Sequence, residues 1–487
     1  MAPSAANEIC RMDAVTLVKN IQDRKVSPLE VVDAVLARMD KLDPLLHAFC
    51  TPTPDLARAE ARRLEKRMLN GDPVGPLAGV PVGIKDLICT AGIRTTFGSV
   101  AYETFIPDED DIVVERLRQA GAIIIGKTNV SEFGYSALSD NPLFATTRNP
   151  WDLERTPGGS SAGSGAAVAA GIGPLALGSD GGGSVRIPAS FCGIFGMKPS
   201  MGRVPLYPGT RDERLPGGSS FESLEHIGPL SRTVADAALM LSVIGSGPDM
   251  RDRHSLPGPE FAWADCMKGD LAGKRVAVSV DWGTTPVDPE VRRVIEDAAT
   301  VFERELGCVV EAVHPGLPVL REEFWALIAL DSDLKGMRAL VENHGAHMTP
   351  TLVAFIKRAW TAEELTQGVV ARKKVTNVMW RFMQRFDLLL TPTLAVPSFP
   401  LSMRAPSQID GQNVGPSHWT PFAYPFNMSG QPAASVPAGF TNEGLPVGLQ
   451  IVGRHLDDPL VLLAAAAFES ARPWRDKWPP VVTRMGS

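Results

Sequence analysis

The stretch 156–188 constrains the fold more than any other part of the sequence. It reads TPGGSSAGSGAAVAAGIGPLALGSDGGGSVRIP, with a Ser/Gly cluster at each end and small apolar residues between them. Glycine permits positive φ and close approach of backbones, so both clusters indicate main chain shaped around a bound group. The small residues of 162–171 predict a helix packed tightly against neighbouring backbone. Pro174 ends that helix, and 175–177 predict a short buried strand that runs into the second cluster.

Strand and helix signals alternate along most of the chain. The segment GVPVGIKD at 79–86 alternates branched apolar residues with small ones and predicts a strand that holds Lys85 on its small-residue side. A helix and a buried strand are predicted over 111–125, and the pattern of strand, helix and strand recurs over 274–313. This alternation predicts an α/β fold whose sheet is largely covered by helices.

The chain is long enough for more than one part. A capped helix at 27–42 and a charged helix at 55–70 open the sequence, and a later region with three tryptophans shows helical signals without any strand signal. We expect an N-terminal helical arm at 1–74, a core formed by 75–314 and 386–487, and a helical insertion at 315–385 that shapes a cleft.

Charge and cysteine patterns exclude several classes of protein. The net charge is −7 and the 48 Lys and Arg residues are scattered, so we expect no nucleic-acid partner and no membrane-binding face. The N-terminal residues carry charges where a secretory signal needs an apolar core, and the longest apolar stretch, 162–178, contains Pro174. Six widely spaced cysteines without a CxxC pair predict buried free thiols in a reducing compartment. A cytoplasmic monomer or small oligomer is expected.

Several serines of the opening stretch could act as nucleophiles, although each taken singly is more typical of a turn or cap. GSSAG at 159–163 matches the G-x-S-x-G elbow of α/β-hydrolases, but that elbow needs a strand immediately before the serine and a loop precedes this one. The elbow would also need a histidine base, and the eight histidines have no informative neighbourhood. His344 and His347 have metal-like spacing without a third ligand, so no metal site is predicted.

The second cluster offers a better nucleophile. A strand leads into GSDGGGS at 178–184, whose unshielded glycine amides can converge on one oxygen, and Ser184 ends that loop. No phosphate-binding glycine pattern fits it. Lys85 is the best candidate base because it is an isolated cation on an otherwise apolar strand, where burial would lower its pKa towards neutrality.

These residues together resemble the amidase signature family of serine hydrolases. GGSSAGS at 158–164, GSDGGGSVRIPAS at 178–190 and the segment around Lys85 carry the resemblance, and their separations along the chain agree with it. Two departures, Ala162 in place of glycine and Gly181 in place of Thr or Ile, remove no catalytic atom. Further similarity is found at 121–133, 192–204, 228–241 and near the C-terminus, so the resemblance spans about 10–470 apart from the insertion.

The resemblance implies a three-layer α/β/α fold with a large central mixed, mostly parallel sheet, and a Ser-Ser-Lys triad without a cofactor. Ser184 would be the nucleophile, Ser160 the bridging serine on a cis peptide after Gly159, and Lys85 the neutral base. The remaining residues implied are the oxyanion-hole amides of Gly181, Gly182 and Gly183 and the supporting residues Ser161, Asp180 and Arg186.

The expected reactants are water and a small amide with apolar or aryl groups. The aromatic residues expected to line the cleft are Tyr135, Trp325, Trp419, Phe422 and Tyr424. A carbamate presents its carbonyl to the same triad, so a carbamate (urethane) hydrolase is an alternative. Another is the partner-bound, glutamine-hydrolysing A subunit of an amidotransferase, but its members carry an acidic residue shortly before 424–427, and none lies between Asp410 and Glu443 here. A non-catalytic binding protein is a further alternative, and the arm could pair two copies in a homodimer.

Overall fold

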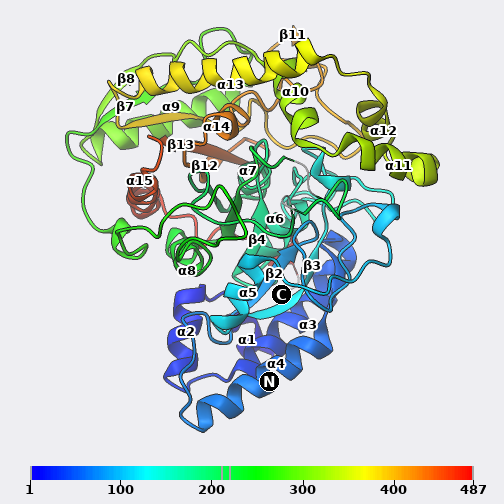
Figure 1. Cartoon of the computed structure of the whole chain (residues 1–487). Helices are drawn as coiled ribbons and strands as arrows, with labels where there is room; N and C mark the ends of the chain where they lie inside the picture. The colour runs from blue at the N-terminus through cyan, green and yellow to red at the C-terminus, as the bar shows by residue number, and fades with distance from the viewer. Residues whose placement is uncertain (1–2, 210–211, 219–220, 485–487) are drawn as a thin grey trace.

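An eleven-stranded sheet runs through the molecule (Figure 1). The computed structural model describes residues 3–209, 212–218 and 221–484. The strands of this sheet are β1 (Phe49–Pro52), β2 (Pro81–Lys85), β3 (Ile123–Thr128), β4 (Leu175–Ser179), β5 (Phe195–Lys198), β6 (Ile227–Ser231), β7 (Arg275–Val278), β8 (Val309–Ala312), β9 (Leu388–Pro392), β12 (Ala433–Phe440) and β13 (Pro446–Gly453). A separate hairpin pairs β10 (Gln408–Ile409) with β11 (Gln412–Asn413).

The strand order in the large sheet is β1-β3-β2-β4-β6-β5-β12-β13-β9-β7-β8. Strand β2 is parallel to β3 and β4, and β7 is parallel to β8 and β9. The strands from β4 through β6, β5, β12 and β13 to β9 pair in antiparallel fashion. The outermost pair, β1 with β3, is also antiparallel. The expected α/β class with a large mixed sheet is confirmed.

Helices surround this sheet. They are α1 (Pro3–Ile9), α2 (Ala14–Gln22), α3 (Pro28–Leu46), α4 (Pro54–Leu69), α5 (Ile112–Gln119), α6 (Ala162–Ala169), α7 (Arg186–Cys192), α8 (Val234–Ile244), α9 (Pro289–Arg304), α10 (Arg321–Asp331), α11 (Leu334–His344), α12 (Pro350–Lys357), α13 (Ala362–Phe382), α14 (Pro425–Met428), α15 (Asp458–Ala471) and α16 (Pro480–Thr483). Helix α15 packs on α8 and on α9, and all three pack on the sheet, while α6 and α7 form a second packed pair.

The N-terminal helices lie at the lower end of Figure 1, where α3 and α4 pack against β3. Helices α2, α3 and α4 share an apolar cluster with Ile123 and Ile125 of β3, Ala166 of α6 and Val481 of α16. The helices of 321–382 lie at the opposite end of the molecule, and α11 and α12 pack against Phe97 and Phe133. The helical arm and helical insertion remain predicted divisions of the chain.

The structure adds strands where the sequence predicts none. Strand β12 contains Pro437 at a shift of register. Proline and glycine weaken a strand signal, yet proline is tolerated in a sheet at such bulges. Strands β5 and β6 are short and carry Gly196, Gly228 and Pro229, which hide them in the same way. All six cysteines are buried free thiols, as expected.

Candidate functional site

Lys85 ends β2 at the centre of the candidate site. Its side chain is fully buried, and its Nζ lies 2.8 Å from Ser160 Oγ, 2.8 Å from Ser179 Oγ and 3.1 Å from the Ser179 carbonyl oxygen. Strands β2 and β4 are parallel neighbours, so their carboxyl ends lie at the same edge of the sheet. Lys85 and Ser179 are the last residues of these strands and therefore meet there. The structure therefore brings together two of the predicted triad residues and adds Ser179 as a second hydroxyl partner of Lys85.

The surroundings of Lys85 favour its neutral form. Burial lowers the pKa of its amine from the ordinary value of 10.5 to about 8, against the opposing charges of Glu225 and Asp180. The other buried lysines of the region differ, because Lys127 faces Asp86 at 3.5 Å and Lys198 donates to the carbonyl oxygens of Pro199 and Gln431. Lys85 is the buried lysine that contacts serine hydroxyls.

Ser160 and Ser161 lie where a loop enters α6. The peptide bond between Gly159 and Ser160 is cis. Ser161 supports the neighbouring strand end, since its Oγ donates to the Ser179 carbonyl at 3.1 Å and accepts from the Ser179 N–H at 3.3 Å. The Ser161 N–H donates to the Ser184 carbonyl at 3.3 Å. The two Ser/Gly clusters are thus joined directly, with Ser184 on one side and Ser160 on the other.

Residues 180–184, which we call the glycine loop, connect β4 to the turn before α7. Within the described residues, the N–H groups of Gly181, Gly182 and Ser184 donate to no protein acceptor. Unpaired amides beside a hydroxyl are what an oxyanion hole requires. The Gly183 N–H differs, because it donates to Asp180 Oδ1 at 2.6 Å and so holds the loop itself. Ser184 is 9% exposed and Ser160 only 2%, so Ser184 is the hydroxyl more accessible to a substrate.

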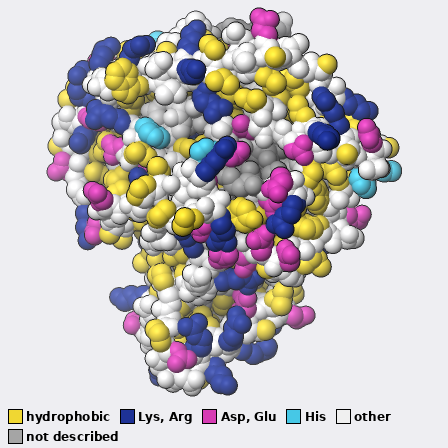
Figure 2. Space-filling view, in the orientation of Figure 1, with side chains coloured by type: hydrophobic (Ala, Val, Ile, Leu, Met, Phe, Trp, Pro, Cys, Tyr) yellow, Lys and Arg dark blue, Asp and Glu magenta, His cyan; other side chains and the backbone are white. Residues whose placement is uncertain are grey.

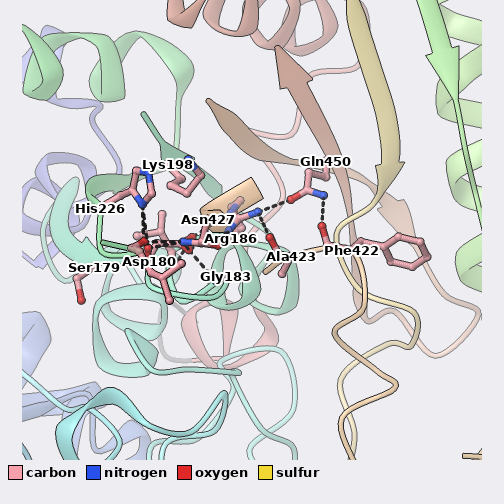
Figure 3. A network of polar contacts seen from close by, with 12 residues as sticks. Ser179, Asp180, Gly183, Arg186, Lys198, His226, Phe422, Ala423, Asn427 and Gln450 are labelled. Atoms are coloured by element: carbon pink, nitrogen blue, oxygen red, sulfur yellow. Dashed lines mark hydrogen bonds and ion pairs between the residues drawn. The ribbon is translucent and has the colours of Figure 1, made fainter. Parts of the chain in front are cut away.

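Asp180 and Arg186 form a buried ion pair that fixes the glycine loop (Figure 3). Arg186 uses all five of its N–H groups, of which two bond Asp180 at 2.9 Å and the others bond Ala423 O, Gln450 Oε1 and Asn427 Oδ1. Burial alone would raise the pKa of the Asp180 carboxyl, but Arg186 and Asn427 bring it below its usual value. The pair therefore links the glycine loop to α7 and to the residues around Asn427 and Gln450.

Asn427 and Gln450 belong to this network although no sequence motif points to them. Asn427 Nδ2 donates to the Asp180 carbonyl at 2.6 Å and to its carboxylate at 2.9 Å. Gln450 accepts from Arg186 at 2.7 Å and donates to the Phe422 carbonyl at 2.8 Å. Both side chains are at most 1% exposed. They connect the glycine loop to α14 and β13 (Figure 3), and a buried polar residue in an apolar strand is the signal that could have identified Gln450.

Two of the predicted cleft residues face the protein interior instead. Trp419 is 3% exposed, and its ring stacks on that of Phe191 with 5.8 Å between the ring centroids. Phe422 is fully buried, and its ring centroid lies 5.1 Å from that of Trp282. The expectation that they line an open cleft needs correction. An aromatic residue in a polar, proline-rich segment can serve the core as readily as a cleft, and only the tertiary packing distinguishes the two.

The other predicted aromatic residues belong to a continuous set of ring contacts. The ring centroid of Tyr135 lies 4.9 Å from that of Phe221 and 5.2 Å from that of Phe355. The centroids of Phe355 and Trp325 are 5.6 Å apart. The ring centroid of Phe324 lies 6.2 Å from that of Trp325 and 4.9 Å from that of Tyr424. We call these six residues the aromatic wall, which consists of Tyr135, Phe221, Phe324, Trp325, Phe355 and Tyr424.

The aromatic wall meets the glycine loop at two points that sequence reasoning misses. A Cβ added to Gly182 would lie 2.9 Å from Phe324 Cζ, and one added to Gly181 would lie 3.1 Å from Phe221 Cδ1. Both rings therefore stand directly against the loop that carries the predicted oxyanion amides. No sequence signal marks Phe324 over Trp325, because adjacent helical residues point in different directions.

Neither a metal cluster nor a membrane-spanning helix is present among the described residues. No group of three or more His, Cys, Asp or Glu that could hold a metal is found in the part of the chain that the structure describes. Within the described ranges, no helix has both the length and the hydropathy needed to cross a bilayer. On the face shown in Figure 2, basic and acidic side chains are interspersed.

Comparisons with known proteins give consistent results. The sequence model of a family described as Amidase matches residues 30–462. An acylamidase of Rhodococcus erythropolis is 40% identical over 480 residues, which cover 96% of this chain and 97% of that protein. The A subunit of a glutamyl-tRNA(Gln) amidotransferase from Carboxydothermus hydrogenoformans is 36% identical, and the match covers 95% of this chain and 97% of that protein.

Solved structures give the same result as the sequences. A bacterial aryl acylamidase of the amidase signature enzymes superposes with a TM-score of 0.88 at 34% identity, over 95% of this chain and 96% of that one. A 6-aminohexanoate cyclic dimer hydrolase superposes with a TM-score of 0.87 at 29% identity, over 97% of this chain and 99% of that one.

Proposed function

The chain belongs to the amidase family, and we propose that it hydrolyses small amides with apolar or aryl groups through an acyl-enzyme on Ser184. The family resemblance carried by the sequence motifs is confirmed, and the protein is an amide-cleaving hydrolase. The roles of individual residues and the choice of substrate are the parts that we propose.

In the proposed reaction, Ser184 Oγ attacks the amide carbonyl and its proton passes to Ser160 Oγ, whose own proton passes to Lys85 Nζ. The carbonyl electrons move onto the oxygen, which accepts hydrogen bonds from the N–H groups of Gly181 and Gly182. The proton returns from Lys85 through Ser160 to the leaving nitrogen, the C–N bond breaks and an amine departs. Water then hydrolyses the ester on Ser184 by the same proton route.

The observation that carries this proposal is the contact of Lys85 Nζ with Ser160 Oγ at 2.8 Å inside a site that lowers the pKa of the lysine to about 8. A lysine of ordinary pKa is almost entirely charged at neutral pH, whereas a pKa of about 8 leaves about a tenth of the amine neutral at pH 7 and able to accept a proton. The aromatic wall supports the choice of apolar or aryl substrates, because it places rings against Gly181 and Gly182 of the glycine loop.

Two alternatives use the same triad. A carbamate hydrolase differs only in the group beside the carbonyl, and no feature of the site separates it from an amidase. An amidotransferase role is supported by relatives of that name, but the segment 411–442 contains no acidic residue to hold the amino group of glutamine. We further propose a cytoplasmic enzyme whose helical arm can pair two copies, which light scattering of the purified protein would test.

The test is a substrate panel combined with active-site labelling. Hydrolysis rates are measured for aliphatic amides, anilides, aryl carbamates and glutamine, and we expect anilides to be cleaved fastest. A fluorophosphonate is expected to label Ser184 and to leave the Ser184→Ala variant unlabelled. Preference for glutamine, or labelling of Ser161, would contradict the proposal.

A further inference from the structure

Glu132 is a buried acid that has no part in the proposed triad. Its side chain is 2% exposed, and it lies in the segment 131–138, which we call the flanking loop. Its Oε1 accepts a hydrogen bond of 2.7 Å from Ser99 Oγ, and its Oε2 accepts one of 2.6 Å from the Thr349 N–H. Thr349 is the residue before α12. One carboxylate therefore joins the flanking loop to a helix start 217 positions later in the sequence.

The flanking loop lies against the proposed bridging serine. A Cβ added to Gly134 would lie 3.5 Å from Ser160 Oγ, and one added to Gly159 would lie 1.9 Å from the Leu138 carbonyl oxygen. Gly134 has a φ of +74°, which residues with a side chain rarely adopt. The backbone of the flanking loop itself is therefore the surface beside Ser160.

Hydrogen bonds within the flanking loop connect Glu132 closely to this surface. The Gly134 N–H donates to the Ser131 carbonyl at 2.9 Å, and the Tyr135 N–H donates to the Glu132 carbonyl at 3.2 Å. These bonds close two short turns, and the backbone between Glu132 and Gly134 therefore has little freedom. A displacement of Glu132 moves the backbone that stands beside Ser160.

The helix at the other end of this link carries part of the aromatic wall. Phe355 belongs to α12, and its ring centroid lies 5.2 Å from that of Tyr135 and 5.6 Å from that of Trp325. Tyr135 itself lies in the flanking loop, shortly after Glu132. The backbone of Glu132 thus leads to one ring of the wall, and its carboxylate holds the helix that bears another.

The environment of Glu132 makes its hydrogen bonds costly to lose. Burial raises the pKa of its carboxyl, and the hydrogen bonds from Thr349 and Ser99 oppose that rise. N–H groups at the start of a helix carry partial positive charge, which favours a carboxylate there. A buried acceptor that loses its donor retains the full cost of leaving water. The carboxylate therefore holds α12 at a fixed place.

We propose that Glu132 is a positioning residue that places the aromatic wall relative to Ser160. Its carboxylate holds α12 against the flanking loop, and the loop holds its own backbone against Ser160. A substrate ring bound on the wall is thereby set at a fixed distance from the serines that act on its carbonyl group. This inference rests on the proposed roles of Ser160 and of the aromatic wall.

The test is Thr349→Pro, which removes the N–H that donates to Glu132. Proline fits this position, because φ is −59° at Thr349 and the preceding Met348 has the extended backbone that a residue before proline prefers. Release of α12 is expected to raise the KM of an anilide about tenfold, while the KM of a small aliphatic amide changes less than about threefold. The kcat for both substrates is expected to fall about threefold, because the backbone beside Ser160 is held less firmly.

A double variant distinguishes this link from a general loss of structure. Phe355→Ala removes the wall ring that α12 carries and should itself raise the anilide KM. The released helix then has no ring left to misplace, so adding Thr349→Pro to Phe355→Ala should raise that KM by less than about twofold. A further tenfold rise in the double variant would contradict the proposal.

Three further variants keep this test decisive. Thr361→Ala removes the cap of α13, where the Glu364 N–H donates to Thr361 Oγ at 3.2 Å, and should lower Tm without changing either KM. Thr349→Ser keeps both the N–H and a hydroxyl and should restore the anilide KM. If the proline variant does not fold, Glu132→Gln decides, because it replaces one acceptor oxygen by a donor and should raise the anilide KM by a smaller factor.

The outcomes separate this inference from the proposed function. An anilide KM that stays at the wild-type value in the folded Thr349→Pro and Glu132→Gln variants, while Lys85→Ala is inactive, overturns the role of Glu132 alone. An anilide KM that Phe355→Ala leaves unchanged overturns the proposed recognition by the aromatic wall, and this inference with it. Activity of Lys85→Ala near the wild-type level overturns the proposed triad itself.

Discussion

The two sides of the candidate site are built in different ways. Lys85, Ser160 and Ser184 lie at strand ends and helix starts, and hydrogen bonds between small residues hold their loops. The aromatic wall instead draws its rings from separate segments, α10 and α12 among them, and these rings contact one another at tilted angles. The hydroxyls of its two tyrosines add hydrogen bonds, one between Tyr135 and Ser332 Oγ at 2.6 Å and one from the Leu320 N–H to Tyr424 at 3.2 Å.

This difference teaches where reactivity and selectivity are encoded. Proton transfer needs fixed distances, which buried hydrogen bonds to the backbone impose. Recognition of an apolar group needs only a complementary surface, because dispersion and burial are not directional. We therefore expect changes on the polar side to lower the rate for every substrate, and changes in the aromatic wall to alter the ratio between substrates.

The largest effect is expected from Lys85→Ala. Loss of the base should lower kcat/KM by about 10³-fold or more for anilides and aliphatic amides alike. Steady-state kinetics on both substrate classes measure this, with Lys268→Ala as a control because Lys268 pairs with Asp265 on the surface. A loss confined to one class would break the distinction between the two sides.

The next largest effect is expected from Gln450→Met, which keeps the volume of the side chain and removes its bonds to Arg186 and the Phe422 carbonyl. The glycine loop should lose its fixed geometry, so that kcat falls by about 10-fold to 100-fold with little change in KM. Gln450→Glu keeps the acceptor for Arg186 and should retain more of the rate. An unchanged kcat in the Met variant would show that the hydrogen bonds of Gln450 are not needed to hold the glycine loop in its active geometry.

A smaller and selective effect is expected from Phe324→Ala. Removing the ring that stands against Gly182 should change the ratio of anilide to aliphatic-amide kcat/KM by about tenfold, while the rate of the smaller amide stays within about threefold. Trp380→Ala, on the exposed side of α13, is the matched control. Equal losses for both substrates would show that Phe324 affects the rate in general and does not determine selectivity.

The smallest effect is expected outside both sides, at the contact between α2 and α8. Burial, together with the charge of Asp13, raises the pKa of Asp236 to about 7, so the folded protein loses stability as pH rises from about 4 through 7. Asp236→Asn removes this dependence and should gain about 3 kcal/mol relative to the wild type between pH 5 and pH 8.5. Thermal unfolding at both pH values measures it, and kcat should not change.

Much of the polar side could be predicted from the sequence. Glycine and serine clusters are local patterns, and a lysine in an apolar strand is unusual, so Lys85 and Ser184 stand out as candidates from the residues themselves, while the role of Ser160 is implied only by the family resemblance. Ser179 is identifiable only as one of several possible nucleophiles, because its contact with Lys85 depends on which strands are neighbours.

The aromatic side is much less predictable. Ring contacts join residues hundreds of positions apart, such as Tyr135 with Phe355, and composition alone does not reveal such pairs. Trp419 and Phe422 are predicted to line the cleft and belong to the core, while Phe221 and Phe324 carry no signal that marks them. The alternation of strands and helices predicts the fold class, but short strands with Gly or Pro, such as β5 and β6, leave no clear pattern.

The three partners of Lys85 have a consequence for where hydrogens lie. The Ser179 carbonyl can only accept, whereas the hydroxyls of Ser160 and Ser179 can either accept or donate. A neutral amine has two N–H groups and one lone pair, so one hydroxyl must point its hydrogen at the nitrogen and the other must receive one. Neutral Lys85 thus has two possible hydrogen-bond arrangements. Only the arrangement in which the Ser160 hydroxyl donates to Lys85 Nζ allows the Ser160 proton to pass to the lysine.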